Sequence, residues 1–317
     1  MKVKFIKSYL LIITFYGAAL LFYSLTPAHA SNLNGFELSR LSIDRSEIFS
    51  GGPDRDGIPS IDKPKFIAPN QVNFLSDDDL VISFTQDNIT KAYPLRILIW
   101  HEIVNDMVNN RPISITYCPL CGTAMVFDRR VDNKVLSFGV SGLLYRSDVL
   151  MYDRESESLW TQLGMKGVSN TALNKKLKWL PSVHMTWSSW KKAFPNGQVL
   201  STDTGYKRHY AGQAYASYFA SKYAMFPVPD SRKERPDKDK VIGLIINGKA
   251  KAYPTKRLLK ENTIIDSIDK TKITIQYNPS TKSTVITDAN GKQLPSVEAY
   301  WFAWQGFYPN TQIGLGK

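Results

Sequence analysis

The sequence predicts an α+β protein made mostly of antiparallel strands with few helices and built from two related repeat units. Two observations predict this class. Short apolar segments with strand-like alternation are separated by turn residues along most of the chain, which is typical of antiparallel sheets. In addition, residues 81–128 match residues 241–288 without gaps at 13 of 48 positions, against about 3 expected by chance.

The first 30 residues have the pattern of a secretory signal peptide. Three lysines precede an apolar stretch from Tyr9 to Leu25, and Ala28-His29-Ala30 follows. This order predicts cleavage before Ser31 and an extracytoplasmic protein, either periplasmic or secreted. The alternative is an uncleaved N-terminal membrane anchor, because the apolar stretch is long for a signal peptide and short for a spanning helix.

Composition and charge exclude some classes of function. The hydrophobic content of 43% suits a well-packed globular protein. The net charge of +12 falls to +9 without the three leader lysines, and the basic residues are scattered. No helix-turn-helix, zinc-finger or aromatic–basic pattern occurs, which excludes a nucleic-acid-binding protein. We expect a small ligand or an envelope protein as the partner, and no further membrane-spanning segment.

The remaining chain divides into four segments. Residues 31–75 are rich in Gly, Pro and Asp and predict a loop-rich lead-in. Repeat unit 1 spans residues 76–200 and a connecting segment spans 201–237. Residues 238–317 form a degenerate repeat unit 2.

Both units begin with the pattern of a β-hairpin. In unit 1, residues 81–84 and 89–93 are predicted strands, and in unit 2 the turn between the corresponding strands is Asn247-Gly248, the strongest short hairpin signal. Apolar residues at helical spacing then predict a helix over Leu95–Val108. Strands are expected at residues 113–117 and 124–127, on either side of a tight loop.

A second repeated motif shows how the two units differ in length. Trp187-x-x-Trp190 recurs as Trp301-x-x-Trp304 at an offset of 114 residues instead of 160. Unit 1 therefore carries a 46-residue insertion between Arg129 and Thr186. Because both units have the tryptophan pairs, we assign these pairs to packing rather than to ligand stacking.

Long motifs of the chain resemble those of the domain of unknown function 3179 (DUF3179). They are WHEIVND, TYCPLCGTA, FGVSGLLYRSDVLMYDRESESLWTQ, LSTDTGYKRHY and KAYP, and the resemblance covers roughly residues 75–310. It implies a secreted or envelope protein of a family without an established biochemical activity. The chain departs from the family pattern at His209, where an acid usually follows the arginine of the TGxxR segment.

The candidate site is the loop Cys118-Pro119-Leu120-Cys121-Gly122, which holds both cysteines of the chain. Two thiolates at this spacing can bind one metal ion. His101 is the candidate third ligand, because its counterpart in the unit without thiols is Glu261. Two thiolates and an imidazole favour copper, then zinc.

Other residues extend this candidate site. Met125 or Met151 could add a thioether, although core packing explains both. Glu102, Asn105 and Asp106 could form a polar shell around the ligands.

Two alternatives to a metal site stay open, and with them the question whether the protein is an enzyme. Cys118 and Cys121 could act as a thiol–disulfide oxidoreductase, or form a structural disulfide in a non-enzymatic envelope binding module. The insertion offers Ser141 and Asp148, but the sequence around Ser141 lacks the G-x-S-x-G spacing of a hydrolase.

Overall fold

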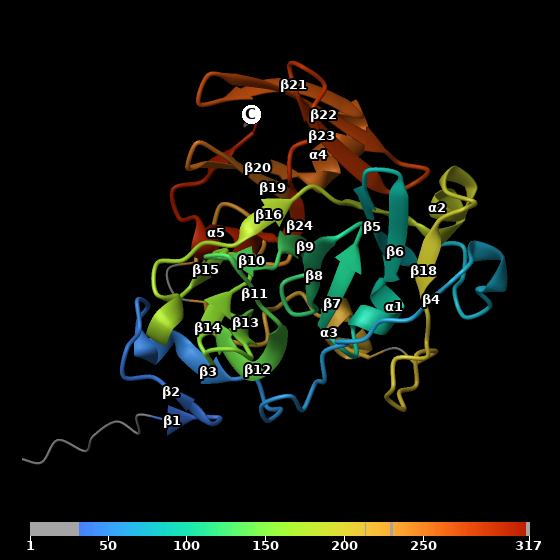
Figure 1. Cartoon of the computed structure of the whole chain (residues 1–317). Coiled ribbons are helices and arrows are strands. Elements are labelled where there is room, and N and C mark those ends of the chain that lie inside the picture. The colour runs from blue at the N-terminus through green and yellow to red at the C-terminus, as the bar shows by residue number, and fades with distance from the viewer. Residues whose placement is uncertain (1–31, 213, 229–230, 315–317) are drawn as a thin grey trace, which may run out of the picture. The chain divides into compact units, whose positions relative to one another are not determined.

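Antiparallel strands dominate the structure and helices are few, as predicted. The structure is a computed structural model that describes residues 32–212, 214–228 and 231–314. The predicted signal peptide, residues 1–30, lies outside the described residues. Five sheets of three to five strands are arranged as a five-bladed, β-propeller-like ring, which the sequence did not predict (Figure 1).

Blades I and II are formed by strands within residues 66–200. Blade I has the strand order β17-β5-β6-β18-β4 and blade II the order β16-β9-β8-β7. The bounds in blade I are Val183–Thr186, Leu80–Gln86, Ile89–Pro94, Gln198–Leu200 and Phe66–Ile67. Those in blade II are Lys178–Leu180, Thr123–Asp128, Arg111–Cys118 and Ile103–Val108.

Blade III consists of the insertion and one strand of the lead-in, in the order β15-β14-β13-β12-β3. Its bounds are Lys166–Gly167, Leu159–Thr161, Asp148–Asp153, Phe138–Tyr145 and Ile48–Ser50. Two small ribbons pair β1 with β2 and β10 with β11, at Asn32–Leu33, Phe36–Glu37, Arg130–Val131 and Lys134–Val135.

Blades IV and V are formed by strands within residues 240–313, with the orders β24-β19-β20-β25 and β21-β22-β23. Their bounds are Val297–Tyr300, Lys240–Ile246, Lys249–Pro254 and Gln312–Ile313, then Thr263–Ile268, Thr271–Asn278 and Ser283–Asp288. Corresponding strands of the two units pair in the same register, as Val81 with Pro94 and Val241 with Pro254.

The helices are short and connect strands. They are α1 Leu95–Leu98, α2 Trp187–Ala193, α3 Ala216–Ala220, α4 Thr255–Glu261 and α5 Trp301–Phe307, with 3₁₀ turns at Arg45–Glu47, Pro69–Gln71 and Asn170–Ala172. The tryptophans of α2 and α5 are buried, in agreement with a packing role. Among the described residues, no helix is long and apolar enough to cross a membrane.

The predicted helix over Leu95–Val108 is wrong beyond its first turn. The chain leaves α1, turns at Glu102 with φ 56°, and continues as strand β7. Ile103, Val104 and Val108 are β-branched and pair with β8, and such residues fit a pleated sheet better than a helix. Sheet pairing therefore outweighs the helical spacing.

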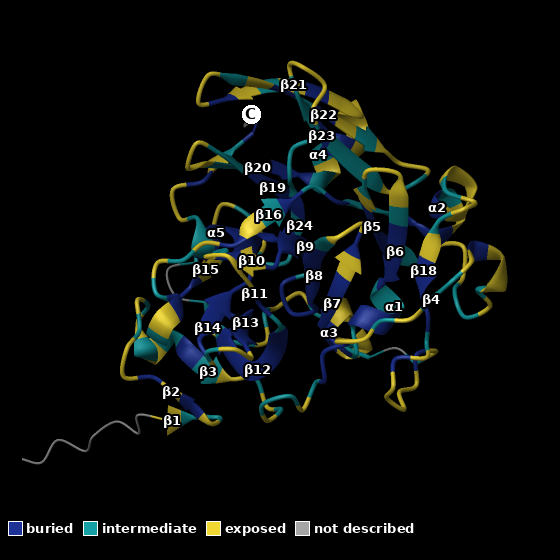
Figure 2. Ribbon diagram, viewed as in Figure 1, coloured by how far each residue is buried: buried dark blue, intermediate teal, exposed yellow. Residues whose placement is uncertain are grey.

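The insertion blade buries the blade that carries the cysteines. Strand β8 is buried from Pro112 to Cys118, whereas its counterpart β22 alternates between buried and exposed residues. Figure 2 shows the same contrast between the strands of blades II and V. Met151 and Trp160 of blade III share one hydrophobic cluster with Cys118 and Cys121.

Candidate functional site

Three buried side chains from blades II and III form the candidate site, which we call the Cys2Asp cluster. Cys118 is the last residue of β8, Cys121 follows in the tight loop, and Asp148 is the first residue of β13. The two sulfur atoms and a carboxylate oxygen all lie within 4.8 Å of one another. Both thiols are free.

The loop between the cysteines is held by backbone contacts from two other segments. Gly122 has φ 65°, a conformation that glycine adopts without strain. The amide of Tyr300 donates to the carbonyl of Cys121 at 2.8 Å, and the hydroxyl of Tyr218 donates to the carbonyl of Leu120 at 2.6 Å. The backbone of the cysteine loop is therefore held from both α3 and β24.

Asp148 is placed by a two-residue turn of blade III. Arg146 and Ser147 both have positive φ angles, 52° and 65°, as a tight hairpin turn requires. The amide of Leu163 donates to Oδ2 of Asp148 at 2.9 Å. Oδ1 is buried and has no hydrogen-bond partner among the described residues, although buried carboxylate oxygens are normally satisfied.

Burial keeps the acidic groups of the cluster protonated to an unusually high pH. It raises the pKa of Asp148 to about 7, although the backbone amide of Leu163 and the two thiols partly offset the effect. Burial raises the pKa of both cysteines as well. In agreement, the thiol of Cys121 donates a hydrogen bond to the carbonyl of Ser147 at 3.2 Å. A cation in the cluster would displace these protons and satisfy the bare oxygen.

Glu102 is a further buried carboxyl beside the cluster. Its pKa is raised to about 8 by burial and by the nearby charge of Asp148. No hydrogen bond within the described part of the chain contributes to this shift. Of the three residues predicted to form a polar shell, Glu102 is the one that interacts electrostatically with Asp148 and Cys118.

The other two predicted shell residues support the scaffold. The side chain of Asn105 accepts from the amide of Phe138 and donates to its carbonyl, which joins blade II to blade III. Asp106 accepts from Lys91 at 2.8 Å and from Tyr93 at 2.6 Å. Blade V repeats this arrangement at Asp266, so it belongs to the repeated fold.

His101 is not brought into the Cys2Asp cluster. Its ring is fully buried, and Nδ1 lies 2.7 Å from the carbonyl oxygen of Pro59. Nε2 lies 2.7 Å from the hydroxyl of Tyr210, which also contacts Thr204 at 2.6 Å. Since both ring nitrogens have other partners, the third ligand predicted from the sequence is replaced by Asp148.

Met125 and Met151 are fully buried in the hydrophobic cluster around the thiols. Their position agrees with core packing. From the sequence, Asp148 was identified only as a polar residue of the insertion and not as a metal ligand. The signal that could have singled it out is that the insertion occurs in the same repeat unit as the thiols.

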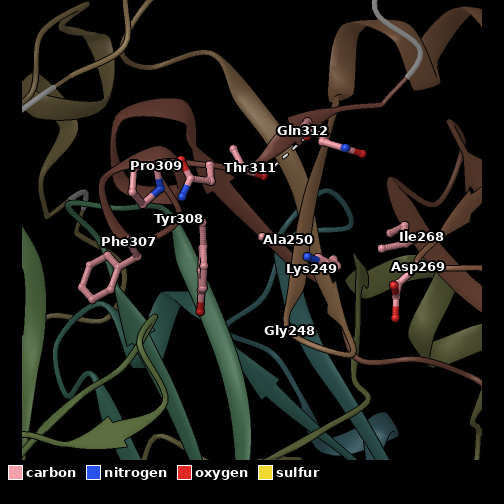
Figure 3. A pocket seen from close by; sticks show the side chains of 11 residues that line it. Gly248, Lys249, Ala250, Ile268, Asp269, Phe307, Tyr308, Pro309, Thr311 and Gln312 are labelled. Atoms are coloured by element: carbon pink, nitrogen blue, oxygen red, sulfur yellow. Dashed lines mark hydrogen bonds between the residues drawn. The ribbon is translucent and has the colours of Figure 1, made fainter.

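A second feature connects Asp148 with a surface cavity. Tyr308 is one of the residues that line a cavity of about 610 Å³ (Figure 3). Its hydroxyl donates to the carbonyl of Leu163, the residue whose amide holds Asp148. The backbone that positions the carboxylate is therefore itself held from the wall of this cavity.

Comparison with known proteins places the chain in a family. Searches among curated proteins and among solved structures gave no match. The profile of a protein of unknown function, DUF3179, matches residues 55–294, which include both cysteines, Asp148 and at least part of every blade. The chain therefore belongs to the DUF3179 family.

Proposed function

We propose that the protein binds zinc through Cys118, Cys121 and Asp148. The observation that carries the proposal is a buried set of two thiols and a carboxylate within 4.8 Å of one another, one oxygen of which has no partner among the described residues. Ligands of one tetrahedral zinc ion lie roughly 3–4 Å apart, given Zn–S and Zn–O bonds of about 2.0–2.3 Å. Small side-chain rotations would suffice to reach this geometry.

The donor atoms favour zinc over copper. A histidine as third ligand would have favoured copper, but the structure supplies a carboxylate, a hard donor that suits Cu(I) poorly. Zinc accepts thiolate and carboxylate oxygen together. Copper therefore becomes the second candidate.

The environment of the thiols argues against thiol–disulfide exchange. Redox-active cysteines are partly exposed and have lowered pKa values. Cys118 and Cys121 are at most 1% exposed, and burial raises the pKa of both thiols. Metal binding would stabilise both thiolates together, whereas exchange requires one thiolate to be accessible.

Three protein ligands would leave a fourth position on the metal, as in catalytic zinc sites. Glu102 is a nearby buried carboxyl that interacts electrostatically with Asp148 and Cys118. Whether the protein is an enzyme therefore depends on the access of small molecules to this position.

The repeat supports a dedicated site rather than a fold requirement. We infer that blades I and II and blades IV and V are two copies of one unit, with blade III inserted into the first. The second copy has Asn278 and Thr281 at the cysteine positions and still forms the same strand pairing. The scaffold thus forms without thiols, and the copy that has them also has the insertion that supplies Asp148.

Metal content tests the proposal. The mature protein, purified under reducing conditions and reconstituted with zinc or Cu(I), should bind about one zinc per chain. Cys118→Ser, Cys121→Ser and Asp148→Asn should each lower the affinity by at least about tenfold, a loss of one ligand. Asp132→Asn, a change at an exposed aspartate, is the matched control, and His101→Gln should keep the stoichiometry. Less than a tenth of an equivalent of either metal would refute the site.

We also propose that the mature protein acts outside the cytoplasm, on the strength of the leader pattern, and that its partner is a small ligand or an envelope protein. N-terminal sequencing of the exported protein should give Ser31 as the first residue. Recovery of intact residues 1–30 in the membrane fraction would instead identify an anchor.

A further inference from the structure

A second polar cavity lies where blades I, IV and V meet. Its volume is about 170 Å³. The edge strands β17, β23 and β24 each contribute a residue to its wall: His184, Thr284 and Glu298. Lys240 of β19, Tyr277 of β22 and Lys282 add further polar groups. None of these residues belongs to the Cys2Asp cluster.

The cavity lies between equivalent positions of the two repeat units. His184 and Glu298 are 114 residues apart and pair with Ile82 and Ile242, which are 160 residues apart. Leu80 and Lys240, also 160 residues apart, line the cavity together. At these equivalent positions, unit 1 thus supplies Leu80 and His184 where unit 2 supplies a lysine and a glutamate.

The comparison indicates that strand pairing does not require the ion pair between Lys240 and Glu298. The strands pair in the same register with Leu80 and His184 as with Lys240 and Glu298. The ammonium of Lys240 lies 2.7 Å from Oε1 of Glu298, and their side chains are 49% and 26% exposed. A pair so accessible contributes little to stability, so folding alone does not explain it.

The charged groups of the cavity wall form two ion pairs. Lys240 pairs with Glu298 at 2.7 Å, and Lys282 pairs at 3.1 Å with Asp78, a residue outside this wall. Burial lowers the pKa of His184. Hydroxyl donors surround the charges, and that of Thr255 is buried without a partner among the described residues.

We propose that this cavity binds a small monocarboxylate, with Lys240 as the main cationic contact. The accessible ammonium of Lys240 suits a carboxylate, and the hydroxyls of Ser182, Thr255 and Ser296 suit a ligand with a hydroxyl or keto group. A cavity of about 170 Å³ has room for a small organic acid such as lactate. The ligand carboxylate competes with Glu298 for the ammonium of Lys240.

This competition gives two variants with opposite expected effects. In calorimetric titrations at fixed ionic strength, lactate, pyruvate or acetate should bind saturably, and lactamide, which lacks the charge, should not. Lys240→Met should weaken binding by roughly tenfold or more, the value of one charge-assisted hydrogen bond. Glu298→Gln should strengthen it several-fold because the competing carboxylate is gone.

Matched controls keep the result interpretable. Lys272→Met changes an exposed lysine of β22 that does not line the cavity and should leave binding unchanged. Asp132→Asn, a change at an exposed aspartate that does not line the cavity, should also leave binding unchanged. Absence of saturable binding for all three carboxylates would overturn the proposal. So would weaker binding by Glu298→Gln in a protein whose melting temperature is unchanged.

Discussion

Replacing Glu102 with glutamine should remove a pH-dependent destabilisation of the metal-free protein. Glu102 is 7% exposed, and its pKa is raised from 4.5 to about 8 by burial and by Asp148. A group whose pKa is raised on folding stabilises fully below its unfolded pKa, and this contribution is lost as the pH rises through the folded value. The wild-type protein should therefore lose stability between about pH 4.5 and pH 8.

The size of the effect follows from the pKa shift. One pKa unit corresponds to about 1.4 kcal/mol, so a shift from 4.5 to about 8 amounts to about 5 kcal/mol in full, of which about 4 kcal/mol falls between pH 5 and pH 8.5. Glutamine has nearly the same shape and no charge. The free energy of unfolding of Glu102→Gln minus that of the wild type should consequently rise by this order between pH 5 and pH 8.5.

Urea unfolding with a metal chelator, at pH 5, 6.5 and 8.5, measures this difference directly. Glu261→Gln is the control, because its side chain is 41% exposed and forms a surface ion pair, so its effect should stay below about 0.5 kcal/mol. A wild-type–variant difference that is the same at pH 5 and pH 8.5 would show that Glu102 is not desolvated in the folded protein.

Three further predictions concern the same region. Zinc affinity, measured by competition with a chromogenic chelator, should increase from pH 6 to pH 8, because the thiols with raised pKa values must lose protons to bind the metal; an affinity independent of pH would exclude thiolate ligands. Asn105→Ala should lower the free energy of unfolding by about 2 kcal/mol, since it removes both bonds to Phe138, and an unchanged urea midpoint would contradict this role. Tyr218→Phe should increase the rate of thiol labelling in the folded protein, because it releases the carbonyl of Leu120; an unchanged rate would show that this bond does not restrict access to the thiols.

Local patterns predicted the strands better than the arrangement of the sheets. Both hairpins formed where alternation and turn residues placed them, at β5–β6 and β19–β20. The helix over Leu95–Val108 failed because Ile103 and Val104 suit either period, and only the partner strand β8 decides between them. The ring could not be predicted, since closing five sheets depends on contacts between segments far apart in sequence.

The two cysteines of the candidate site could be predicted from the sequence, whereas Asp148 could not, because its position depends on strand pairing. Cys118 and Cys121 are neighbours in sequence, so their spacing alone places two thiols near one point. Asp148 reaches them through the pairing of β12 with β13 and the positive φ angles of Arg146 and Ser147. His101 was a reasonable candidate by the repeat comparison, but the turn at Glu102 and the contact with Tyr210 place it elsewhere.

The two repeat units appear in the ring with complementary chemistry. Unit 1 has thiols and a covering blade, and unit 2 has Asn278 and Thr281 at those positions on a half-exposed sheet. At the cavity between the repeat units, unit 2 has the charged residues instead. It carries Lys240 and Glu298 at the positions where unit 1 has Leu80 and His184. The strand registers are the same at both places, so the differing side chains leave the strand pairing unchanged. The backbone of Tyr300, paired with Lys240 in β19, donates to the carbonyl of Cys121. The residue that would bind the ligand carboxylate thus pairs with the residue whose amide holds the cysteine loop.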